Sequence, residues 1–415
     1  METAPTRKWP FQYKWLIAFT GMLALFTALG LGRFALGMLL PSMGATLDLS
    51  YAQMGFIGTV NFVGYFVAVF LTRYAVAHFG SRPVICMALL VLGASMILVG
   101  RAGGFTEVML LYTVTGAASG FANVPMVSLV THWFPPEQRG KAAGIMSVGS
   151  GLGIMFSAVV IPLVNERLGP EGWRTSWLIF GVIGLALAAA CLVLLREHSQ
   201  TYGKTPAPKK ADAAAAAAAA APALPAKAGR WLVPHLGSAY FMFGFTYSIY
   251  VTFIVTTLVQ ERGYTEAVAS DFWFWVGFLS MFSGPVFGTV SDRLGRKAGL
   301  CLVFALQGLA YVLVAGAFPS YALYLSIGFF GVCAWSIPSI MAATVGDYVG
   351  PQQAVKVFGS VTLIFSLGQI MGPALAGVLA ERSGGFASSY WLAAVMAGTA
   401  VLISLSLRKP RVHWE

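Results

Sequence analysis

Apolar and polar stretches alternate along the whole chain, and the apolar ones are long. A helix needs about 20 mostly apolar residues to cross a hydrocarbon core about 30 Å thick. The stretches that meet this requirement are Trp15–Pro41, Ala52–Tyr74, Pro83–Gly100, Val108–Phe134, Ala142–Val164, Trp173–Leu195, Trp231–Val259, Ala267–Val290, Ala298–Phe318, Tyr321–Val345, Val357–Leu379 and Tyr390–Leu407. The pattern predicts an all-α membrane protein with twelve transmembrane helices. The first stretch is too long for the apolar region of a signal peptide, so we expect it to be retained.

The composition excludes most other classes of protein. Hydrophobic residues make up 58% of the 415 residues, charged residues only 10%, and the mean hydropathy is +0.76. Soluble domains do not have this composition. The sequence has no P-loop, no metal-ligand spacing and no arrangement typical of a catalytic nucleophile, so we expect neither an enzyme nor a cofactor. The cysteines lie inside apolar stretches without C-x-x-C spacing, which indicates small core residues.

Basic residues are unevenly distributed around the apolar stretches. Lys and Arg near the ends of spans remain cytoplasmic, and with both termini inside, the cytoplasmic segments hold most of the 26 basic residues. The opposite loops hold only Arg101, Arg167, Arg174, Arg262 and Arg382. We therefore expect both termini in the cytoplasm. The net charge of +11 follows from this topology and suits an anionic lipid leaflet, and nothing suggests nucleic-acid binding.

The middle of the chain differs from the rest. Residues 197–229 contain Lys, Pro and a run of alanines without an apolar face, which is typical of a loose linker. We expect a cytoplasmic tail, a six-helix bundle, a flexible cytoplasmic linker, a second six-helix bundle and a second cytoplasmic tail, formed by residues 1–14, 15–195, 196–230, 231–407 and 408–415.

The second half of the chain repeats the first in a single register without a gap, the register that matches Gly80 with Gly295. The other matching pairs are Arg82 and Lys297, Pro136 and Pro351, Gln138 and Gln353, Lys141 and Lys356, Gly144 and Gly359, and Gly153 and Gly368. Two parallel halves related by an axis along the membrane normal place a solute site at their interface near the midplane, and one half can rock against the other. This architecture is typical of a carrier rather than a pore.

One short loop carries a resemblance to a known family. Residues 288–297, GTVSDRLGRK, resemble the loop between helices 2 and 3 that the major facilitator superfamily repeats between helices 8 and 9. In that family the acidic and basic residues of the loop latch neighbouring helices on the cytoplasmic side. The resemblance implies a conformational latch formed by Asp292, Arg293, Gly295, Arg296 and Lys297. The first copy departs from the pattern, with Ala77 in place of the aspartate and Arg73 in place of the leading glycine.

Further segments extend the resemblance over nearly the whole chain. The segments 133–144, WFPPEQRGKAAG, and 172–174, GWR, are frequent in the superfamily. Residues 32–34, GRF, residues 39–41, LLP, and residues 271–273, DFW, resemble the bacterial YbfB/YjiJ-type branch, and helices 4, 5, 10 and 11 are more weakly similar to oxalate/formate and monocarboxylate carriers. The resemblance implies a monomeric secondary transporter of the bacterial inner membrane, with the fold of two pseudo-symmetric six-helix bundles.

Two ionisable residues within the spans are candidates for the transport chemistry. Arg33 lies well inside the first span, where a guanidinium facing the central cavity would bind a carboxylate; a snorkelling side chain or a fixed ion pair is the structural alternative. Asp271 lies near the outer start of the eighth span and is a candidate for proton coupling. An acidic residue near a helix start is also favoured by the exposed amide groups. If Asp271 approaches Arg33 in one conformation, protonation would release the arginine for substrate.

Uncharged polar and aromatic residues complete the candidate lining of the central site. Asn61 and Tyr65 share one face of the second span, and Tyr247 and Tyr250 are three residues apart on the seventh, where they could present their hydroxyls together. The other candidates are Asn123, Trp335 and Gln369. Interhelical hydrogen bonding or core packing is the alternative role for each of these residues.

These residues support a secondary carrier for a small organic anion that is proton-linked or an exchanger. Its partners would be the substrate, a proton and the lipid bilayer. The alternative is proton-driven efflux of hydrophobic or cationic compounds, which would use the aromatic residues of the second half as an apolar pocket. Cation pumps generally need a buried carboxylate, and none is evident in the first, fourth or seventh span. A sensor without transport activity would not need the latch at Asp292–Lys297.

Overall fold

The computed structural model describes residues 13–197 and 226–407, and these ranges contain helices but no strand. The helices of the first half are α1 Tyr13–Leu25, the π-helical η1 Phe26–Phe34, α2 Ala35–Thr46, α3 Tyr51–Phe79, α4 Ser81–Val99, α5 Phe105–Trp133, α6 Pro136–Leu168, the 3-10 turn η2 Gly169–Glu171 and α7 Gly172–Leu194. Those of the second half are α9 Ala226–Thr256, the π-helical η3 Thr257–Glu261, α10 Glu266–Leu294, α11 Arg296–Ala315, α12 Tyr321–Cys333, α13 Ser336–Val349, α14 Pro351–Ser383 and α15 Ala387–Leu405.

These helices cross the membrane twelve times, as the sequence predicts. In the described residues, 11 continuous helical stretches are long and apolar enough to span a bilayer. One of them, Gln138–Leu194, has 57 residues and would be about 85 Å long as a single straight helix, far more than one bilayer. This stretch turns back at η2, so that α6 and α7 are separate passes. The predicted all-α fold is confirmed.

The two helices that border the predicted linker differ in how closely their ends match the predicted boundaries. The first half ends in a non-helical stretch after Leu194, whereas α9 begins at Ala226, inside the segment 196–230 that the sequence predicts to be flexible. The helix therefore starts earlier than the apolar pattern predicts. The rest of the linker and most of the two predicted tails lie outside the described residues.

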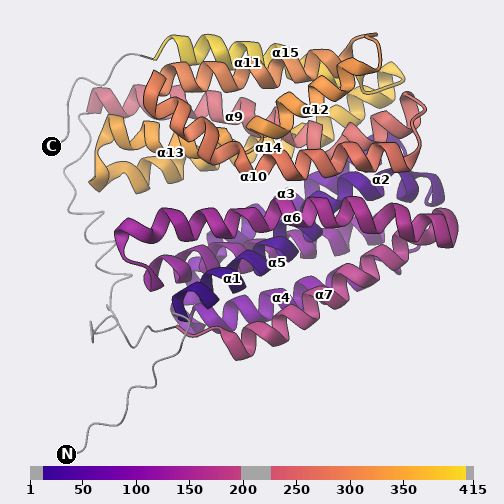
Figure 1. Ribbon diagram of the computed structural model, residues 1–415, viewed down its shortest axis with the longest axis horizontal. Helices are drawn as coiled ribbons and strands as arrows, with labels where there is room; N and C mark the ends of the chain where they lie inside the picture. Colours follow the sequence, from indigo (N-terminus) through magenta and orange to yellow (C-terminus); the bar gives the residue numbers. More distant parts are fainter. Residues whose placement is uncertain (1–12, 198–225, 408–415) are drawn as a thin grey trace, which may run out of the picture.

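The helices form two bundles that lie side by side (Figure 1). Helices α1 to α7, coloured indigo to magenta, form the first half, and α9 to α15, coloured red to yellow, form the second. The halves meet mainly where α3 packs against α14 and where α6 packs against α10, with α2 against α9 between them. A site on the inner faces of these helices is therefore shared by both halves.

The same helix crossing occurs in both halves. Gly153 of α6 packs against the first span, where an added Cβ would lie 2.7 Å from the carbonyl oxygen of Phe26. Gly368 of α14 packs in the same way against α9, where an added Cβ would lie 2.9 Å from the amide nitrogen of Phe245 and closer still to the carbonyl oxygen of Phe241. Phe26 and Phe241 match in the same register as Gly153 and Gly368, so the sequence repeat is also a repeat of packing.

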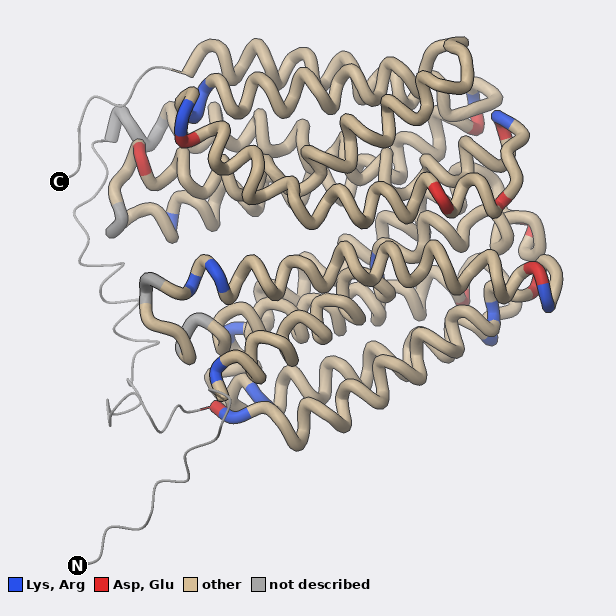
Figure 2. Tube along the Cα trace, viewed as in Figure 1, with Lys and Arg blue, Asp and Glu red and all other residues tan. Residues whose placement is uncertain are grey.

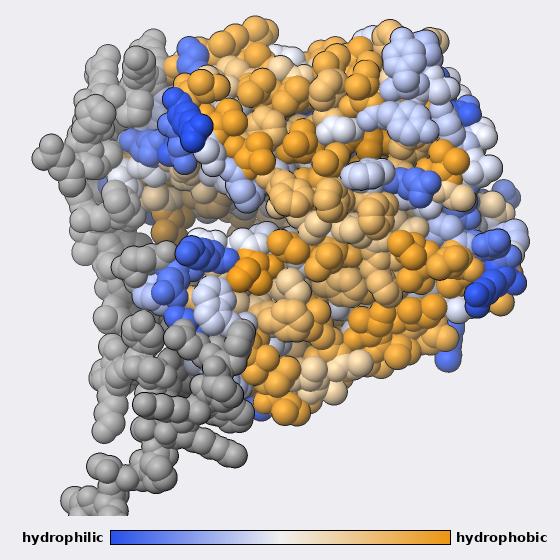
Figure 3. All heavy atoms as spheres, in the orientation of Figure 1, coloured by the Kyte–Doolittle hydropathy of each residue, from blue (hydrophilic) through white to orange (hydrophobic). Residues whose placement is uncertain are grey.

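The two ends of the molecule differ in how tightly the halves meet. We call the end that carries Glu197 and Ala226 the linker end and the opposite end the far end. Charged residues gather at both ends (Figure 2), with an apolar belt between them, and the halves are separated by a hollow at the linker end (Figure 3). At the far end the rings of Tyr51 and Phe386, from different halves, lie 4.8 Å apart. The molecule is thus closed at the far end and open at the linker end.

Candidate functional site

Arg33 is held in the middle of the molecule by an irregular part of the first span. The span changes from α-helix to π-helix over Phe26–Phe34, and Arg33 lies in the last turn of this segment. Single π-helical turns inside α-helices often occur at functional sites. Gly30 in the same segment lies against Gly153 of α6, where an added Cβ would be 2.6 Å from the Gly153 Cα. The close approach fixes the segment against the bundle.

Arg33 is buried, with 8% of its surface exposed, and one of its terminal nitrogens has no partner in the described residues. Its Nε donates to Asn61 Oδ1 at 3.4 Å, and its guanidinium carbon lies 4.1 Å from the ring centroid of Tyr65 and 5.0 Å from that of Phe62. The Arg33 carbonyl accepts a hydrogen bond of 3.0 Å from the Tyr112 hydroxyl. The nitrogen without a partner is Nη2. The guanidinium is therefore positioned by aromatic faces and one amide, while part of its donor capacity remains unused.

The first half also supplies the other polar residues around Arg33. Asn61 Nδ2 donates to the carbonyls of Gly32 at 3.4 Å and Tyr112 at 3.3 Å, so this side chain ties α3 to the first span and to α5. Asn123 Nδ2 donates to the Tyr65 hydroxyl at 2.8 Å. The four predicted residues of this half, Arg33, Asn61, Tyr65 and Asn123, thus form one connected group.

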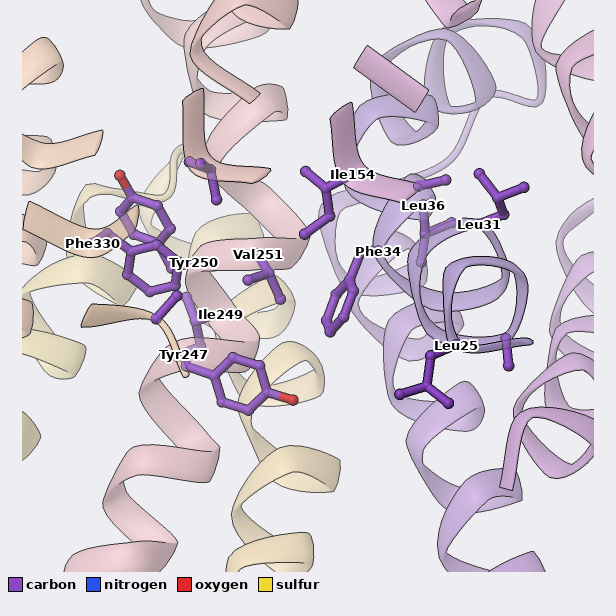
Figure 4. Packing of buried hydrophobic residues seen from close by; sticks show 14 of the residues in the cluster. Leu25, Leu31, Phe34, Leu36, Ile154, Tyr247, Ile249, Tyr250, Val251 and Phe330 are labelled. Carbon is purple, nitrogen blue, oxygen red and sulfur yellow. The ribbon is translucent and has the colours of Figure 1, made fainter. Parts of the chain in front are cut away.

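The second half faces this group with a neutral aromatic wall. Gln369 Nε2 donates to the Tyr247 hydroxyl, and this hydroxyl is also within electrostatic reach of the Arg33 guanidinium. The Trp335 ring lies 5.6 Å from that of Tyr247 and 5.0 Å from that of Phe34, which belongs to the first half. Figure 4 shows Tyr247 directed toward the helix that carries Phe34. The structure therefore brings Tyr247, Trp335 and Gln369 to the same site.

A break in the tenth span sets the position of Trp335. Helix α12 ends at Cys333 and α13 begins at Ser336, and Trp335 between them has φ −112° and ψ 16°. Ser283 of α10 accepts a hydrogen bond of 3.1 Å from the Trp335 amide through its hydroxyl, and its carbonyl accepts one of 3.0 Å from the Ser336 hydroxyl. Ser283 was not predicted from the sequence, because nothing local shows that it supports a break in another helix.

Two of the predicted site residues lie elsewhere. The Tyr250 hydroxyl shares a hydrogen bond of 2.9 Å with Ser326, and its ring stacks on Phe330 at 3.9 Å inside the second bundle, so it does not join Tyr247. Three positions along a helix leave two side chains only about 60° apart around its axis, so the different neighbours of Tyr247 and Tyr250 come from the packing and not from the spacing. Asp271 is exposed, and its side chain has no hydrogen bond or ion pair with any described residue. The approach of Asp271 to Arg33 is therefore absent from this conformation.

Asp292 and Arg296 of the predicted latch form an ion-pair cluster with Asp347 at the linker end. Arg296 Nε donates to Asp347 Oδ2 at 2.7 Å, and its Nη1 pairs with Asp292, so the cluster joins α10, α11 and the end of α13. Gly295 makes the turn with φ +91°, a conformation that glycine adopts readily. Arg293 and Lys297 are exposed beside it. Asp347 is the partner that the loop sequence alone did not identify.

The equivalent loop of the first half is stabilised by different bonds. Gly80 repeats the turn with φ +86°, but Ala77 offers no carboxylate. Glu197, beyond the end of α7, accepts a hydrogen bond of 3.0 Å from the Arg82 amide, and the Arg82 side chain donates to the Leu192 carbonyl. The acidic group missing from the loop is thus replaced by one from a distant part of the sequence.

At the far end the second half supplies carboxylates and the first half supplies donors. Glu381 of α14 accepts hydrogen bonds from the Ser50 hydroxyl at 2.7 Å and the Ala52 amide at 2.9 Å, at the start of α3. Glu266 of α10 accepts one of 2.6 Å from Asn165 Nδ2 of α6. These bonds join the halves and must break if the far end opens.

Two pseudo-symmetric bundles with a buried polar site between them define a membrane carrier of the major facilitator type. Residues 25–405 match the model of the family described as "Uncharacterised MFS-type transporter YbfB", and the chain belongs to this family. The family consists of transporters rather than enzymes, as the sequence predicts. The resemblance to the YbfB-type branch is confirmed.

Several curated transporters are similar over most of their length. The hexuronate transporter of Bacillus subtilis is 26% identical, covering 91% of this chain and 90% of that protein. The probable sulfoacetate transporter SauU of Cupriavidus necator is 22% identical, covering 90% and 89%. Monocarboxylate transporter 2 of Mesocricetus auratus is 24% identical, covering 86% and 75%.

Solved structures show the same fold. The bacterial homolog of the human lysosomal transporter Spinster, in an inward-facing and unoccupied conformation, has a TM-score of 0.72 at 17% identity and covers 94% of this chain and 96% of its own. The nucleoside transporter NupG has a TM-score of 0.70 at 14% identity, with coverage of 95% and 98%.

Proposed function

We propose that this protein is a secondary active carrier for a small organic anion of the carboxylate type. The observation that carries the proposal is the buried Arg33 guanidinium between the two halves, which has an unpartnered Nη2 and forms no ion pair with any described residue. Placing a charged side chain near the bilayer centre costs about 2.5–3.5 kcal/mol on insertion scales. A carboxylate ligand would offset this cost and use the free donor.

The distribution of acidic residues supports an anionic ligand. In residues 13–197 and 226–407, every Asp and Glu lies in a connection or within about two turns of a helix end. None of them reaches the middle of a span, where a cationic substrate would need a counter-ion. The names of the three relatives, hexuronate, sulfoacetate and monocarboxylate transporters, all refer to compounds that carry a carboxylate.

The uneven distribution of basic residues predicts how the protein lies in the membrane, and the bonds at the far end predict what must change during transport. The linker end carries the larger share of basic residues and would face the cytoplasm of a bacterial inner membrane, with both termini cytoplasmic. The hollow at this end then corresponds to a conformation open to the cytoplasm. Alternating access would require the bonds of Glu266 and Glu381 at the far end to break as the linker end closes. The site would take the anion with a proton or in exchange for another anion, and Asp271 remains the candidate for proton coupling.

The proposal is tested by thermal unfolding of the detergent-purified, full-length protein with monocarboxylates, dicarboxylates, amino acids and lipophilic cations. A ligand at 100 times its dissociation constant adds about 2.7 kcal/mol to the free energy of unfolding. We expect stabilisation by one class of anion. Arg33→Gln should weaken that binding roughly 100-fold, because it leaves the anion without its charged partner. Arg33→Lys should retain more, since it keeps the charge but lacks the two-pronged geometry.

A matched control separates binding from general damage. Tyr250→Phe removes a buried hydroxyl from the same helix as Tyr247 but outside the site, so anion binding should persist. If every anion binds the Arg33→Gln and native proteins equally, the anion proposal fails. A response only to lipophilic cations, unchanged in Arg33→Gln, would instead support proton-driven efflux.

A further inference from the structure

The central site contains two buried donors that lack partners among the described residues, one from each half. Arg33 Nη2 comes from the first span, and the indole Nε1 of Trp335 comes from the break between α12 and α13. The Trp335 ring is in contact with Phe34, the neighbour of Arg33, at a centroid distance of 5.0 Å. Buried polar atoms in native proteins nearly always have a partner, so each of these donors has room for an acceptor that the described residues do not supply.

The other two predicted residues of the second half at this site, Tyr247 and Gln369, are paired with each other and are uncharged. Gln369 donates to Tyr247, and the rings of Tyr247, Trp335 and Phe365 form the wall around that pair. In the described residues, the other Lys and Arg side chains of the spans lie near the helix ends, so Arg33 is the one cation available at mid-depth. A second negative charge on the ligand would have no partner there.

From this arrangement we infer that the ligand is a monocarboxylate whose remaining atoms are uncharged, and that its carboxylate bridges the two halves. One carboxylate oxygen accepts from Arg33 and the other accepts from Trp335 Nε1. The inference rests on the proposed anion transport and narrows it to one charge. The body of the ligand then lies against the ring faces of Phe34, Tyr65 and Tyr247, which suit apolar and C–H surfaces.

This bridge assigns Trp335 a role in specificity that its packing does not require. The indole ring would fill its place against Phe34 and Tyr247 equally well without the N–H group. A dicarboxylate would have to leave its second carboxylate against neutral aromatic rings, where an uncompensated charge is strongly disfavoured. Discrimination should therefore depend on ligand charge more than on ligand size.

The experiment measures the binding of ligand pairs that share a carbon skeleton and differ by one carboxylate, gluconate with glucarate and butyrate with succinate, to the purified full-length protein. Calorimetry and thermal unfolding give the dissociation constants. We expect the monocarboxylate of a pair to bind at least tenfold more tightly than its dicarboxylate. Trp335→Phe, which keeps a ring but removes the N–H donor, should weaken monocarboxylate binding about tenfold.

The matched control is Trp273→Phe. Trp273 of α10 is also a buried indole whose Nε1 has no partner in the described residues, but its ring is not among the rings packed on Trp335 or Tyr247 there, so its replacement should leave the dissociation constant unchanged. The selectivity for monocarboxylates over dicarboxylates is measured on the native protein. This part of the test therefore remains valid even if the Trp335→Phe protein fails to fold.

The outcomes distinguish this inference from the proposed function. If dicarboxylates bind as tightly as their monocarboxylate partners, and Arg33→Gln abolishes both, anion transport stands and the single-charge inference is overturned. Unchanged monocarboxylate binding in Trp335→Phe overturns the bridge. If no anion of either kind binds, both the proposed function and the inference fail.

Discussion

The two halves of the molecule share the same helix packing but contribute different chemistry to the site, a buried cation from the first half and a neutral aromatic wall from the second. At the equivalent crossings, Gly153 meets the backbone at Phe26 and Gly368 meets it at Phe241, so the register of the repeat is preserved. The site residues do not obey the repeat. In the register of the repeat, the equivalents of Arg33, Asn61, Tyr65 and Asn123 are Ser248, Val276, Ser280 and Pro338, in that order. The equivalents of Tyr247, Trp335 and Gln369 are Gly32, Gly120 and Ile154.

This difference indicates what each part of the repeat provides. Close helix crossings keep each bundle rigid, so that it can rock as a body against the other, and both halves need them. Recognition of a small anion needs one cationic side chain and, opposite it, a neutral wall for the rest of the ligand. A second copy of either in the other half would not help to bind the anion. The scaffold is therefore symmetric and the site is not.

The largest effect is expected at the symmetric crossings. Gly153→Ala and Gly368→Ala each place a Cβ less than 3.0 Å from the neighbouring backbone, which cannot move aside as a flexible side chain can. Each should destabilise the protein by about 1–3 kcal/mol through overpacking. The midpoint of thermal unfolding should fall by a similar amount in both variants.

The repeat itself provides the controls for this prediction. Gly144 and Gly359 lie on the same two helices and match each other in the same register, and an added Cβ at either would have no atom within 4 Å. Alanine is the better helix former by about 1 kcal/mol, so Gly144→Ala and Gly359→Ala should leave the unfolding midpoint unchanged or raise it. If Gly368→Ala behaves like Gly359→Ala, the two crossings are not equivalent.

The fold was predictable because each span is long and the repeat keeps one register. Lengths near the bilayer thickness fix the number of helices, and identical glycines in both halves reveal the pairing. The helix start at Ala226 was missed because residues before Trp231 are not apolar, and a helix can continue beyond the membrane without an apolar pattern. The turn at η2 lies between the predicted spans Ala142–Val164 and Trp173–Leu195.

The site was predictable only where a residue is unusual in a membrane. Arg33 stands out as a charge within a span, and polar residues such as Asn123 and Gln369 stand out for the same reason. Tyr250 could not be separated from Tyr247, because positions three apart lie on nearly the same face of a helix and only the tertiary packing gives the two hydroxyls different partners. The partners Asp347 and Glu197 are far from the loops they stabilise, so no local pattern could indicate them.

A smaller effect is expected where the halves meet at the far end. Asn165→Ala removes the donor to Glu266, and Glu381→Ala removes the acceptor for Ser50 and Ala52. Hydrogen bonds to charged groups are among the stronger ones, so Asn165→Ala should shift the balance toward a conformation open at the far end roughly tenfold. Glu381→Ala should shift it in the same direction but less, because water competes for the exposed Glu381 carboxylate.

The shift can be measured by chemical labelling of a buried cysteine. Thr252 is 5% exposed, and its methyl group lies against Gly58 of the other half, so Thr252→Cys becomes accessible from the far side when the halves separate. A membrane-impermeant maleimide added from that side should label it faster in the Asn165→Ala and Glu381→Ala backgrounds. Ser388→Ala, which alters a hydrogen bond within the second half alone, serves as the control and should leave the rate unchanged. Equal rates in all backgrounds would show that these bonds do not hold the far end closed.

The smallest effect is expected at the two loops of the linker end, where the halves differ in the kind of bond. Arg296 pairs with Asp292 and Asp347, whose side chains are 62% and 45% exposed, so Arg296→Ala should cost no more than about 1 kcal/mol. Glu197→Ala removes the acceptor of the Arg82 amide, with a cost of similar size.

A change in salt concentration distinguishes these two losses of stability. Raising the ionic strength from about 0.1 M to 1 M shortens the screening length from about 10 Å to 3 Å and weakens exposed ion pairs. The unfolding midpoints of the native protein and Arg296→Ala should therefore converge in the higher salt. The difference between the native protein and Glu197→Ala should persist, because the short-range hydrogen bond from the Arg82 amide, which this variant lacks, is not removed by the shorter screening length. If salt removes both differences equally, the first half also relies on long-range charge attraction, and the contrast between the two loops disappears.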